Sequence, residues 1–354
     1  MINRLTSEAV DLLRGMVAIP SPSFSEGEVC TYISRWLDDK GVVHSRIGNN
    51  IIAEYIADPS FPTLMLCAHI DTVSPCEGYT FDPYKPENCP SDMVQGLGSN
   101  DDGASVVSMI AAFRYFSAMP ATEKSPNLLL VLTCEEERSG INGMTGLWPQ
   151  IKDNVDYAIV GEPTCMKAAT AERGLLVIDA TAHGVSGHAA RNEGVNAISI
   201  ALEDIKALQS HVFEKISPRM GKVNLNVTQI NAGTAHNVIP DICTFVIDIR
   251  PTEQYSNEEI LNELQGICRS ELKARNLMNR SSATYTDSKL QKTAELLGIE
   301  TFSSPTTSDW MRISCDAVKM GPGDSSRSHR KDEFVFVKEI EGGIRTYIEF
   351  INHL

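Results

Sequence analysis

Four short, mostly apolar segments are the feature of this sequence that most limits its fold. They are residues 63–68 (TLMLCA), 128–133 (LLLVLT), 157–160 (YAIV) and 317–320 (AVKM). A continuous apolar run of this length is typical of a strand that is buried on both faces of a sheet. Helical patterns at residues 28–40 and 104–116 alternate with these segments. The chain is therefore predicted to form an α/β fold whose mixed, mostly parallel sheet is covered by helices.

Each of the four segments leads into side chains that can bind a metal ion. They are His69 and Asp71 after the first segment, Glu135, Glu136 and Glu137 after the second, Glu162 after the third and, beyond a Gly-Pro-Gly turn, His329 after the fourth. Ligands of open α/β sheets bind outside the carboxyl ends of the strands. The sequence therefore predicts that these distant residues converge on one crevice.

A different pattern begins near residue 173, where apolar and polar residues alternate as in strands with one exposed face. The predicted elements are strands at residues 175–181, 223–230 and 244–250 and helices at 195–210 and 257–274. We therefore predict a small α/β domain of residues 173–285, inserted into a larger domain formed by residues 1–172 and 286–354.

The composition limits the partners and the compartment. The chain has 31 Lys and Arg against 46 Asp and Glu, a formal net charge of −15, so neither nucleic acid nor an anionic membrane is an expected partner. No stretch reaches the roughly 18 apolar residues of a membrane span, and the N-terminus lacks the apolar core of a secretory signal. The nine cysteines include no Cys-x-x-Cys pair, which argues against a disulfide framework and a thiolate zinc site. These features predict a cytoplasmic protein.

Two acidic segments suit a pair of metal ions. In residues 96–103 (GLGSNDDG), either Asp101 or Asp102 can bridge two cations through its two oxygens, although each can equally be the N-cap of the following helix. In the run at residues 135–137, one acid can bind metal while its neighbour acts as a general base; the alternative is a solvated loop. Asp71 can accept the second ring N–H of His69 and so orient that ring.

Seven motifs occur in an order that resembles one enzyme family. They are AHIDTV (68–73), GLGSNDDG (96–103), TCEEERSG (133–140), GEPT (161–164), GHAARNEGVNAI (187–198), GTAHNVIPD (233–241) and GPGDSSRSHRKDE (321–333). Through them, nearly the whole chain resembles the zinc aminoacylase superfamily, which includes acetylornithine deacetylase, succinyl-diaminopimelate desuccinylase and related dinuclear carboxypeptidases. The resemblance implies a catalytic zinc domain formed by residues 1–172 and 286–354. It also implies that residues 173–285 are a lid and dimerisation domain, and that the protein is a homodimer.

The same resemblance implies a metal centre with two zinc ions, which cobalt can replace. The five expected ligands are His69 and Glu162 for the first zinc, Glu137 and His329 for the second, and Asp101 as the bridge between them.

Roles in catalysis and substrate binding also follow from the resemblance. Glu136 would be the general base, Asp71 would orient His69, and His188 would reach across the dimer to stabilise the oxyanion of the reaction. The residues expected to bind the substrate are Asn237, Arg250 and Gly323.

Two positions depart from the family pattern. The family usually has a basic residue between its acidic pair and the next glycine, whereas Gly103 follows Asp102 directly; Asp101 is favoured as the bridge, and Asp102 stays an alternative. The family often has Asp-Glu-Glu where this chain has three Glu. A shift of one residue would make Glu135 the base and Glu136 the ligand.

The expected reaction is the hydrolysis of a linear amide in a small N-acyl amino acid. The first candidate substrate is N-acetylornithine in arginine biosynthesis, followed by N-acetyl- or N-succinyl-citrulline. The alternatives are a succinyl-diaminopimelate desuccinylase, a dinuclear zinc di- or carboxypeptidase and, in another class, a noncatalytic metal-stabilised binding protein. Residues 305–310 (PTTSDW) are expected to border the pocket, where Asp309 is either an attractant for a cationic substrate group or an exposed loop acid.

Overall fold

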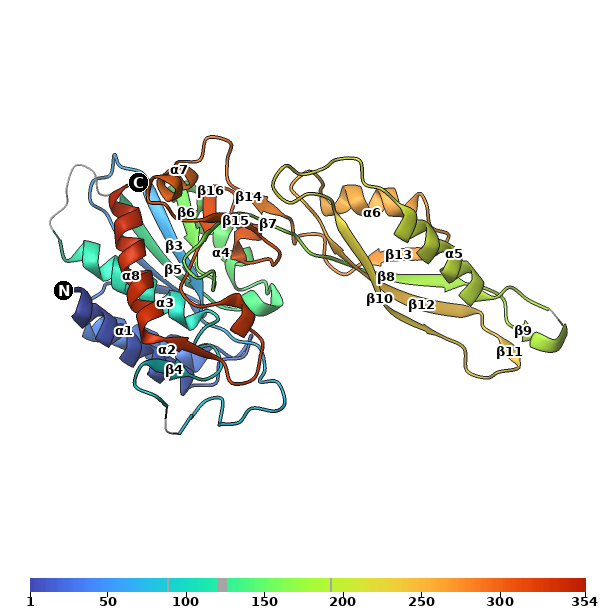
Figure 1. The fold of residues 1–354 in the computed structure, drawn as a ribbon, viewed down its shortest axis with the longest axis horizontal. Coiled ribbons are helices and arrows are strands. Elements are labelled where there is room, and N and C mark those ends of the chain that lie inside the picture. The colour runs from blue at the N-terminus through green and yellow to red at the C-terminus, as the bar shows by residue number, and fades with distance from the viewer. Residues whose placement is uncertain (88, 120–125, 192) are drawn as a thin grey trace. The chain divides into compact units, whose positions relative to one another are not determined.

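The computed structural model describes residues 1–87, 89–119, 126–191 and 193–354, so Asn192 of the motif at 187–198 lies outside the described residues. The chain divides into two compact units (Figure 1). The larger unit consists of Met1–Thr170, Ala283–Phe302 and Ser308–Leu354, and the smaller unit of Ala171–Ser282 and Ser303–Thr307. No helix within these described ranges is both long enough and apolar enough to cross a membrane.

A mixed sheet forms the centre of the larger unit. Its strands follow the order β1 (Ser45–Ile47), β2 (Asn50–Tyr55), β5 (Asn127–Thr133), β3 (Thr63–His69), β6 (Tyr157–Val160), β16 (Asp316–Lys319), β7 (Ala168–Glu172) and β14 (Ser282–Ala283), with β15 (Thr301–Ser304) also paired to β7. The four central strands β5, β3, β6 and β16 are parallel, whereas β1 pairs antiparallel with β2, β2 with β5, and β7 with β16. The four apolar segments of the sequence are these four central strands.

Both faces of the sheet are covered. Leu64 and Leu66 of β3 enter one apolar core and Met65 and Cys67 enter the other, because successive side chains of a strand point to opposite faces. The first core is completed by α1 (Ile2–Val17), α2 (Gly27–Asp39), α3 (Gly103–Ser117), α7 (Lys289–Leu296) and α8 (Val337–Asn352), and the second by α4 (Met144–Ile151) with Trp310. Burial on both faces explains the continuous apolar sequences, and the predicted α/β fold with a mixed, helix-covered sheet is confirmed.

A separate two-stranded ladder joins two segments that are far apart in the sequence. β4 (Met93–Gln95) and β17 (Phe334–Phe336) pair antiparallel, with Phe334 opposite Gln95. The segment that contains Asp101 follows β4, and the segment that contains His329 precedes β17. The ladder therefore brings the two segments together.

The smaller unit contains an antiparallel sheet. Its strand order is β10 (Asn224–Ala232), β12 (Ile242–Arg250), β8 (Leu176–His183) and β13 (Glu271–Ala274), and its helices are α5 (Ala197–Ser210) and α6 (Asn257–Gln265). Leu176, Ile178 and Ala180 of β8 are buried in the core shared with the helices, while Val177 and Asp179 are partly exposed. A short pair of strands, β9 (Gly187–His188) and β11 (Val238–Ile239), completes the unit. The alternating pattern in the sequence thus reflects a sheet with one covered face.

The predicted helix at residues 257–274 is wrong in its second half. α6 ends at Gln265, and Glu271–Ala274 forms β13, which pairs with β8. Leu272 is buried between the exposed Glu271 and Lys273, as expected for a strand with period two. Pairing with β8 satisfies backbone groups that a longer helix would leave at the edge of the sheet.

Candidate metal centre

Polar side chains gather at the carboxyl end of the parallel strands in the larger unit. His69 is the last residue of β3 and is in register with Thr133, the last residue of β5. Glu136 and Glu137 lie in the short 3-10 turn that follows β5, and Glu162 follows β6 by two residues. Since parallel strands in register end at the same edge of a sheet, these residues meet although they are distant in sequence.

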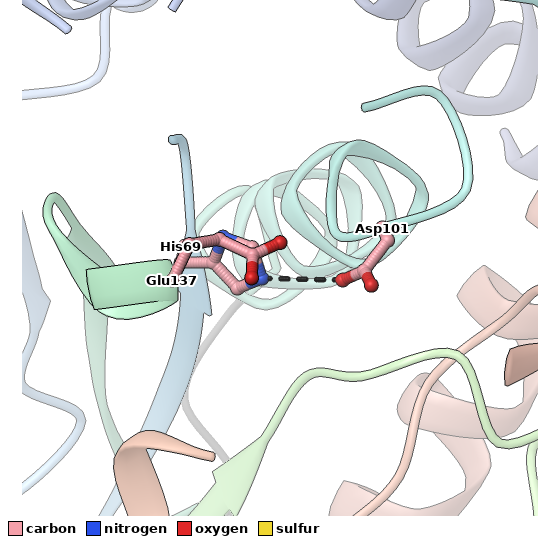
Figure 2. A group of neighbouring side chains, drawn as sticks. All are labelled: His69, Asp101 and Glu137. Carbon is pink, nitrogen blue, oxygen red and sulfur yellow. Dashed lines mark hydrogen bonds and ion pairs between the residues drawn. The ribbon is translucent and has the colours of Figure 1, made fainter. Parts of the chain in front are cut away.

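Asp101 lies between two histidines. Its Oδ1 is 3.3 Å from Nε2 of His69, and its Oδ2 is 3.8 Å from Nε2 of His329. Nε2 of His329 also lies 3.0 Å from Oε1 of Glu137. Figure 2 shows His69 at the end of its strand and Asp101 next to the helix α3; ligand atoms of these two residues and Glu137 all lie within 4.8 Å of one another. One carboxylate placed in this way can bridge two cations.

Glu136 and Glu162 form a second acidic group around His69. One ligand atom from each of the three residues lies within 4.8 Å of the others. Burial raises the pKa of Glu136 well above its ordinary value, and the nearby charge of Glu162 adds to this effect. Burial and the charge of Asp101 raise the pKa of Glu162 in the same way. Crowded carboxylates of this kind are unfavourable unless a cation or a proton compensates them.

The histidines attract protons for the same reason. The hydrogen bond to Glu137 raises the pKa of His329 to about 9. Burial opposes protonation of His69, but Asp101 and Asp71 raise the pKa of His69 well above its ordinary value. Metal binding requires neutral histidine and ionised carboxylate, so a divalent cation would replace these shared protons. Imidazole and carboxylate ligands without thiolates suit a catalytic metal site, and the residues therefore fit such a cation.

Asp71 connects the end of β3 to the acidic turn. Its carboxylate accepts the backbone N–H groups of Glu136 and Glu137, at 3.0 and 3.2 Å, and the hydroxyl of Ser23 at 2.7 Å. Nδ1 of His69 lies 3.0 Å from the backbone oxygen of Asp71 and 3.4 Å from its Oδ1. These contacts orient the ring so that Nε2 faces Asp101.

Glu135 is engaged elsewhere. Its carboxylate accepts the backbone N–H of Asn142 at 3.0 Å and the side-chain amide of Asn142 at 2.7 Å. Its backbone is left-handed, with φ of 59°, so the chain turns sharply between Glu135 and the next residue. This geometry favours Glu136 and Glu137 over Glu135 as the residues that serve the cluster.

Asp102 differs from its neighbour Asp101 in its surroundings. It is the N-cap residue of α3, it is 1% exposed, and neither of its carboxylate oxygens has a hydrogen-bond partner among the described residues. Burial raises the pKa of Asp102 to about 8. Asp101, by contrast, faces both His69 and His329. The geometry therefore favours Asp101 as the bridging residue.

Known proteins resemble this chain in two of its regions and over nearly its whole length. A model described as a peptidase dimerisation domain, M20 type, matches residues 170–276, and a model of peptidase family M28 matches residues 50–159. The acetylornithine deacetylase of Proteus mirabilis is 27% identical, over 94% of this chain and 93% of its own. A peptidase M20 domain-containing protein of Schizosaccharomyces pombe is 26% identical, over 96% of this chain and 82% of its own.

Solved structures share the same fold. An aminopeptidase from Bacillus cereus has a TM-score of 0.77 at 19% identity and covers 98% of each chain. A metallo-carboxypeptidase of the M20 family from Sulfolobus solfataricus also has a TM-score of 0.77, at 14% identity, over 97% of this chain and 98% of its own. The predicted resemblance is confirmed: residues 170–276 match the M20 dimerisation model, and the chain resembles M20 hydrolases over nearly its whole length.

Three residues expected near the substrate lie in the smaller unit. His188 ends β9, is exposed, and accepts the backbone N–H of Ala190 on Nδ1 at 3.2 Å. Asn237 is exposed, and its backbone oxygen accepts the N–H of Ala189 at 3.1 Å. Arg250 donates two hydrogen bonds to the carboxylate of Asp248, at 2.9 and 3.1 Å. Roles for these side chains remain predictions.

Gly323, the fourth expected substrate residue, lies in the larger unit. It has φ of +89°, and a Cβ at this position would clash with Oδ1 of Asn100. Both the left-handed backbone and the close approach therefore require glycine.

Asp309 is not an exposed loop acid. It is 5% exposed, and its Oδ2 accepts the hydroxyl of Thr133 at 2.7 Å. Burial raises the pKa of Asp309 to about 6. The exposed alternative is therefore wrong, because the side chain packs at the end of β5 beside the acidic turn.

Two buried residues near the cluster were not found from the sequence. Asn100 and Glu333 contact the segments that contain Asp101 and His329. The only signal was their position inside the motifs at 96–103 and 321–333.

Proposed function

We propose that the chain is a zinc-dependent amidohydrolase that removes the acyl group from an N-acyl amino acid, with N-acetylornithine as the first candidate substrate. The proposal is supported by relatives named acetylornithine deacetylase, such as that of Proteus mirabilis, which match over nearly the whole chain. A relative named succinyl-diaminopimelate desuccinylase, from Cereibacter sphaeroides, is 27% identical over 73% of this chain. N-Acetyl- and N-succinyl-citrulline are the neighbouring candidates for the substrate.

The observation that carries the proposal is the position of Asp101 between His69 and His329, with Glu136 beside the same cluster. We assign His69 and Glu162 to a first zinc, Glu137 and His329 to a second, and Asp101 to both. Divalent cations at such a centre supply Lewis acidity, which acidifies water and polarises the scissile carbonyl. Cobalt is expected to replace zinc, because it accepts the same nitrogen and oxygen ligands.

Glu136 is the proposed general base. It takes a proton from the attacking water and delivers that proton to the amine that leaves, so one carboxylate serves both halves of the reaction. Asp71 accepts the backbone N–H of Glu136 in a hydrogen bond of 3.0 Å, which fixes the backbone position from which the Glu136 side chain extends. A base without such support would move relative to the reacting carbonyl and lose efficiency.

A hydrolysis screen tests the proposed function. The purified chain, loaded with zinc, is assayed with acetyl and succinyl derivatives of ornithine, citrulline and diaminopimelate, and with a panel of dipeptides. We expect release of the free amino acid from an acyl derivative, loss of activity after treatment with a chelator, and recovery with zinc or cobalt. Hydrolysis of dipeptides alone would favour a peptidase, and a chain that binds metal but hydrolyses none of these compounds would favour a metal-stabilised binding protein.

The smaller unit is the proposed dimerisation domain of a homodimer. The matched model at residues 170–276 is described as a dimerisation domain, and this unit exposes apolar side chains at Leu202 of α5, Ile230 of β10 and Ile242 of β12. A cytoplasmic location is proposed because all nine cysteines are free thiols, as is usual in a reducing compartment.

If His188 acts across this dimer, two inactive variants should complement one another. His188→Ala is expected to lose about 10²- to 10³-fold in kcat, the usual cost of one oxyanion donor. Mixing it with Glu136→Gln and allowing subunits to exchange should restore about a quarter of the wild-type activity, because half of the dimers are then mixed and each has one intact site. No recovery in a sample shown by light scattering and tagged pull-down to contain mixed dimers would contradict a role in trans.

A further inference from the structure

Two segments of the larger unit are tied together by their own side chains, and each contains one of the proposed metal ligands. The first segment, residues 96–102, contains Asp101; the second, residues 321–333, contains His329. The β4–β17 ladder leads into both, and its last hydrogen bond joins the N–H of Gly96 to the backbone oxygen of Glu333 at 2.9 Å. Beyond this point there is no regular strand pairing between the two segments, and side chains continue the connection.

Glu333 reaches from the second segment into the first. Its carboxylate accepts the backbone N–H groups of Gly98 at 3.1 Å, Asn100 at 2.8 Å and Asp101 at 2.9 Å. The side chain is 2% exposed, so these bonds are shielded from water. Three N–H donors to one buried carboxyl group make a geometrically demanding contact. The contact holds the backbone of Asp101 itself.

Asn100 makes the reciprocal connection. Its amide nitrogen donates to the backbone oxygen of Asp324 at 3.1 Å and contacts Oγ of Ser328 at 3.4 Å, while its Oδ1 accepts the N–H of Asp324 at 2.9 Å. Asn100 is fully buried, and the required glycine at 323 leaves room for its side chain. We call Asn100 and Glu333, with these bonds, the loop clamp.

The two proposed metal positions depend on the clamp to different degrees. His69 is the last residue of the central strand β3, and Glu162 follows β6 by two residues, so the sheet itself places the ligands of the first position. His329 lies in an irregular segment, its backbone is left-handed with φ of 57°, and its side chain is 56% exposed. The position of His329 relative to Asp101 is therefore set by the connection between the two segments.

We propose that Asn100 and Glu333 are positioning residues that set the separation of Asp101 and His329 and thereby the affinity of the second metal position. The proposal rests on the two-metal centre of the proposed function. It predicts that loosening the clamp weakens the second metal much more than the first, because only the second needs a ligand from each segment.

The test compares Glu333→Gln with Asp332→Asn. Glutamine keeps the shape of Glu333 but replaces one of its two acceptor oxygens by an N–H₂ group, which faces backbone N–H donors. Asp332 is the matched control because it is the adjacent acidic residue and lies outside the clamp. Its Oδ1 accepts two hydrogen bonds from Thr80, from the backbone N–H at 2.7 Å and from the hydroxyl at 3.1 Å. Zinc stoichiometry and affinity are measured by equilibrium dialysis at buffered free zinc, with thermal unfolding of the metal-free proteins alongside.

We expect two zinc ions in the wild type and in Asp332→Asn. In Glu333→Gln one zinc should stay tight and the other weaken by about 10- to 100-fold, the usual cost of losing a partner that orients a ligand. Excess zinc should then restore kcat with little change in KM. Asn100→Ala is the second variant, and it should show the same selective loss if Glu333→Gln does not fold.

Two zinc ions bound with wild-type affinity by a folded clamp variant would overturn the clamp while leaving the metal centre intact. Equal weakening of both positions would also overturn it, since that result indicates general destabilisation. A wild-type chain that binds no zinc would instead refute the proposed function.

Discussion

Glu136→Gln is expected to keep both metal ions and to lose about 10²- to 10⁴-fold in kcat, the range that proton transfer by a positioned side chain contributes. Glutamine has the shape of glutamate but cannot accept the proton of the attacking water. Because Glu136 is not among the five proposed ligands, metal content should not change. The measurement is zinc stoichiometry together with kcat on the substrate found in the screen.

Retention of near wild-type kcat in Glu136→Gln would rule out its role as the base. Loss of metal would give a different correction, since Glu136 also lies within ligand distance of His69 and Glu162. The matched comparison is Glu135→Gln, in the same acidic run. Its carboxylate binds Asn142, so that variant should lower the unfolding temperature and leave kcat within a few-fold. A larger kcat loss in folded Glu135→Gln than in Glu136→Gln would support the register shifted by one residue.

Asp101→Asn is expected to have the second large effect. An amide presents one oxygen and one N–H₂ group, so it cannot offer an anionic oxygen toward both His69 and His329. Removing a residue that only hydrogen-bonds to a metal ligand weakens metal binding by up to about 100-fold. Because Asp101 is itself a proposed ligand, Asp101→Asn should weaken metal binding by more than this, and its activity should fall with its metal content. Dialysis at buffered free zinc measures the affinity, and activity is followed over the same range of zinc.

Asp102→Asn is the control for the bridge. The two residues are adjacent and of the same type, but the carboxylate of Asp102 is buried with no hydrogen-bond partner in the described part of the chain, while Asp101 faces the two histidines. Asp102→Asn should therefore bind zinc like the wild type. If Asp102→Asn loses metal and Asp101→Asn keeps it, the bridge is the other residue of the pair.

The main features of the fold could be read from the sequence because they depend on local periodicity. A strand buried on both faces needs apolar residues throughout, as in TLMLCA, and a strand with one exposed face alternates, as in Leu176–His183. The second half of the helix predicted at residues 257–274 failed for a related reason. The single apolar residue Leu272, between Glu271 and Lys273, fits both the helical period and the strand period in so short a stretch. The segment forms a strand because it pairs with β8.

The sequence by itself thus determined the four central strands of the larger unit and three of the four strands in the sheet of the smaller unit. It also determined the alternation of strands and helices, and the set of polar residues at the strand ends from which a metal centre is proposed. Only the tertiary structure decided which of these carboxylates face the histidines. Glu135 turns toward Asn142 on a left-handed backbone, and Asp71 holds the N–H groups of Glu136 and Glu137 from 65 and 66 positions away. Likewise, Glu333 binds the Asp101 segment from across the β4–β17 ladder. Side-chain direction in irregular segments depends on such distant hydrogen bonds, and no local pattern of residues records them.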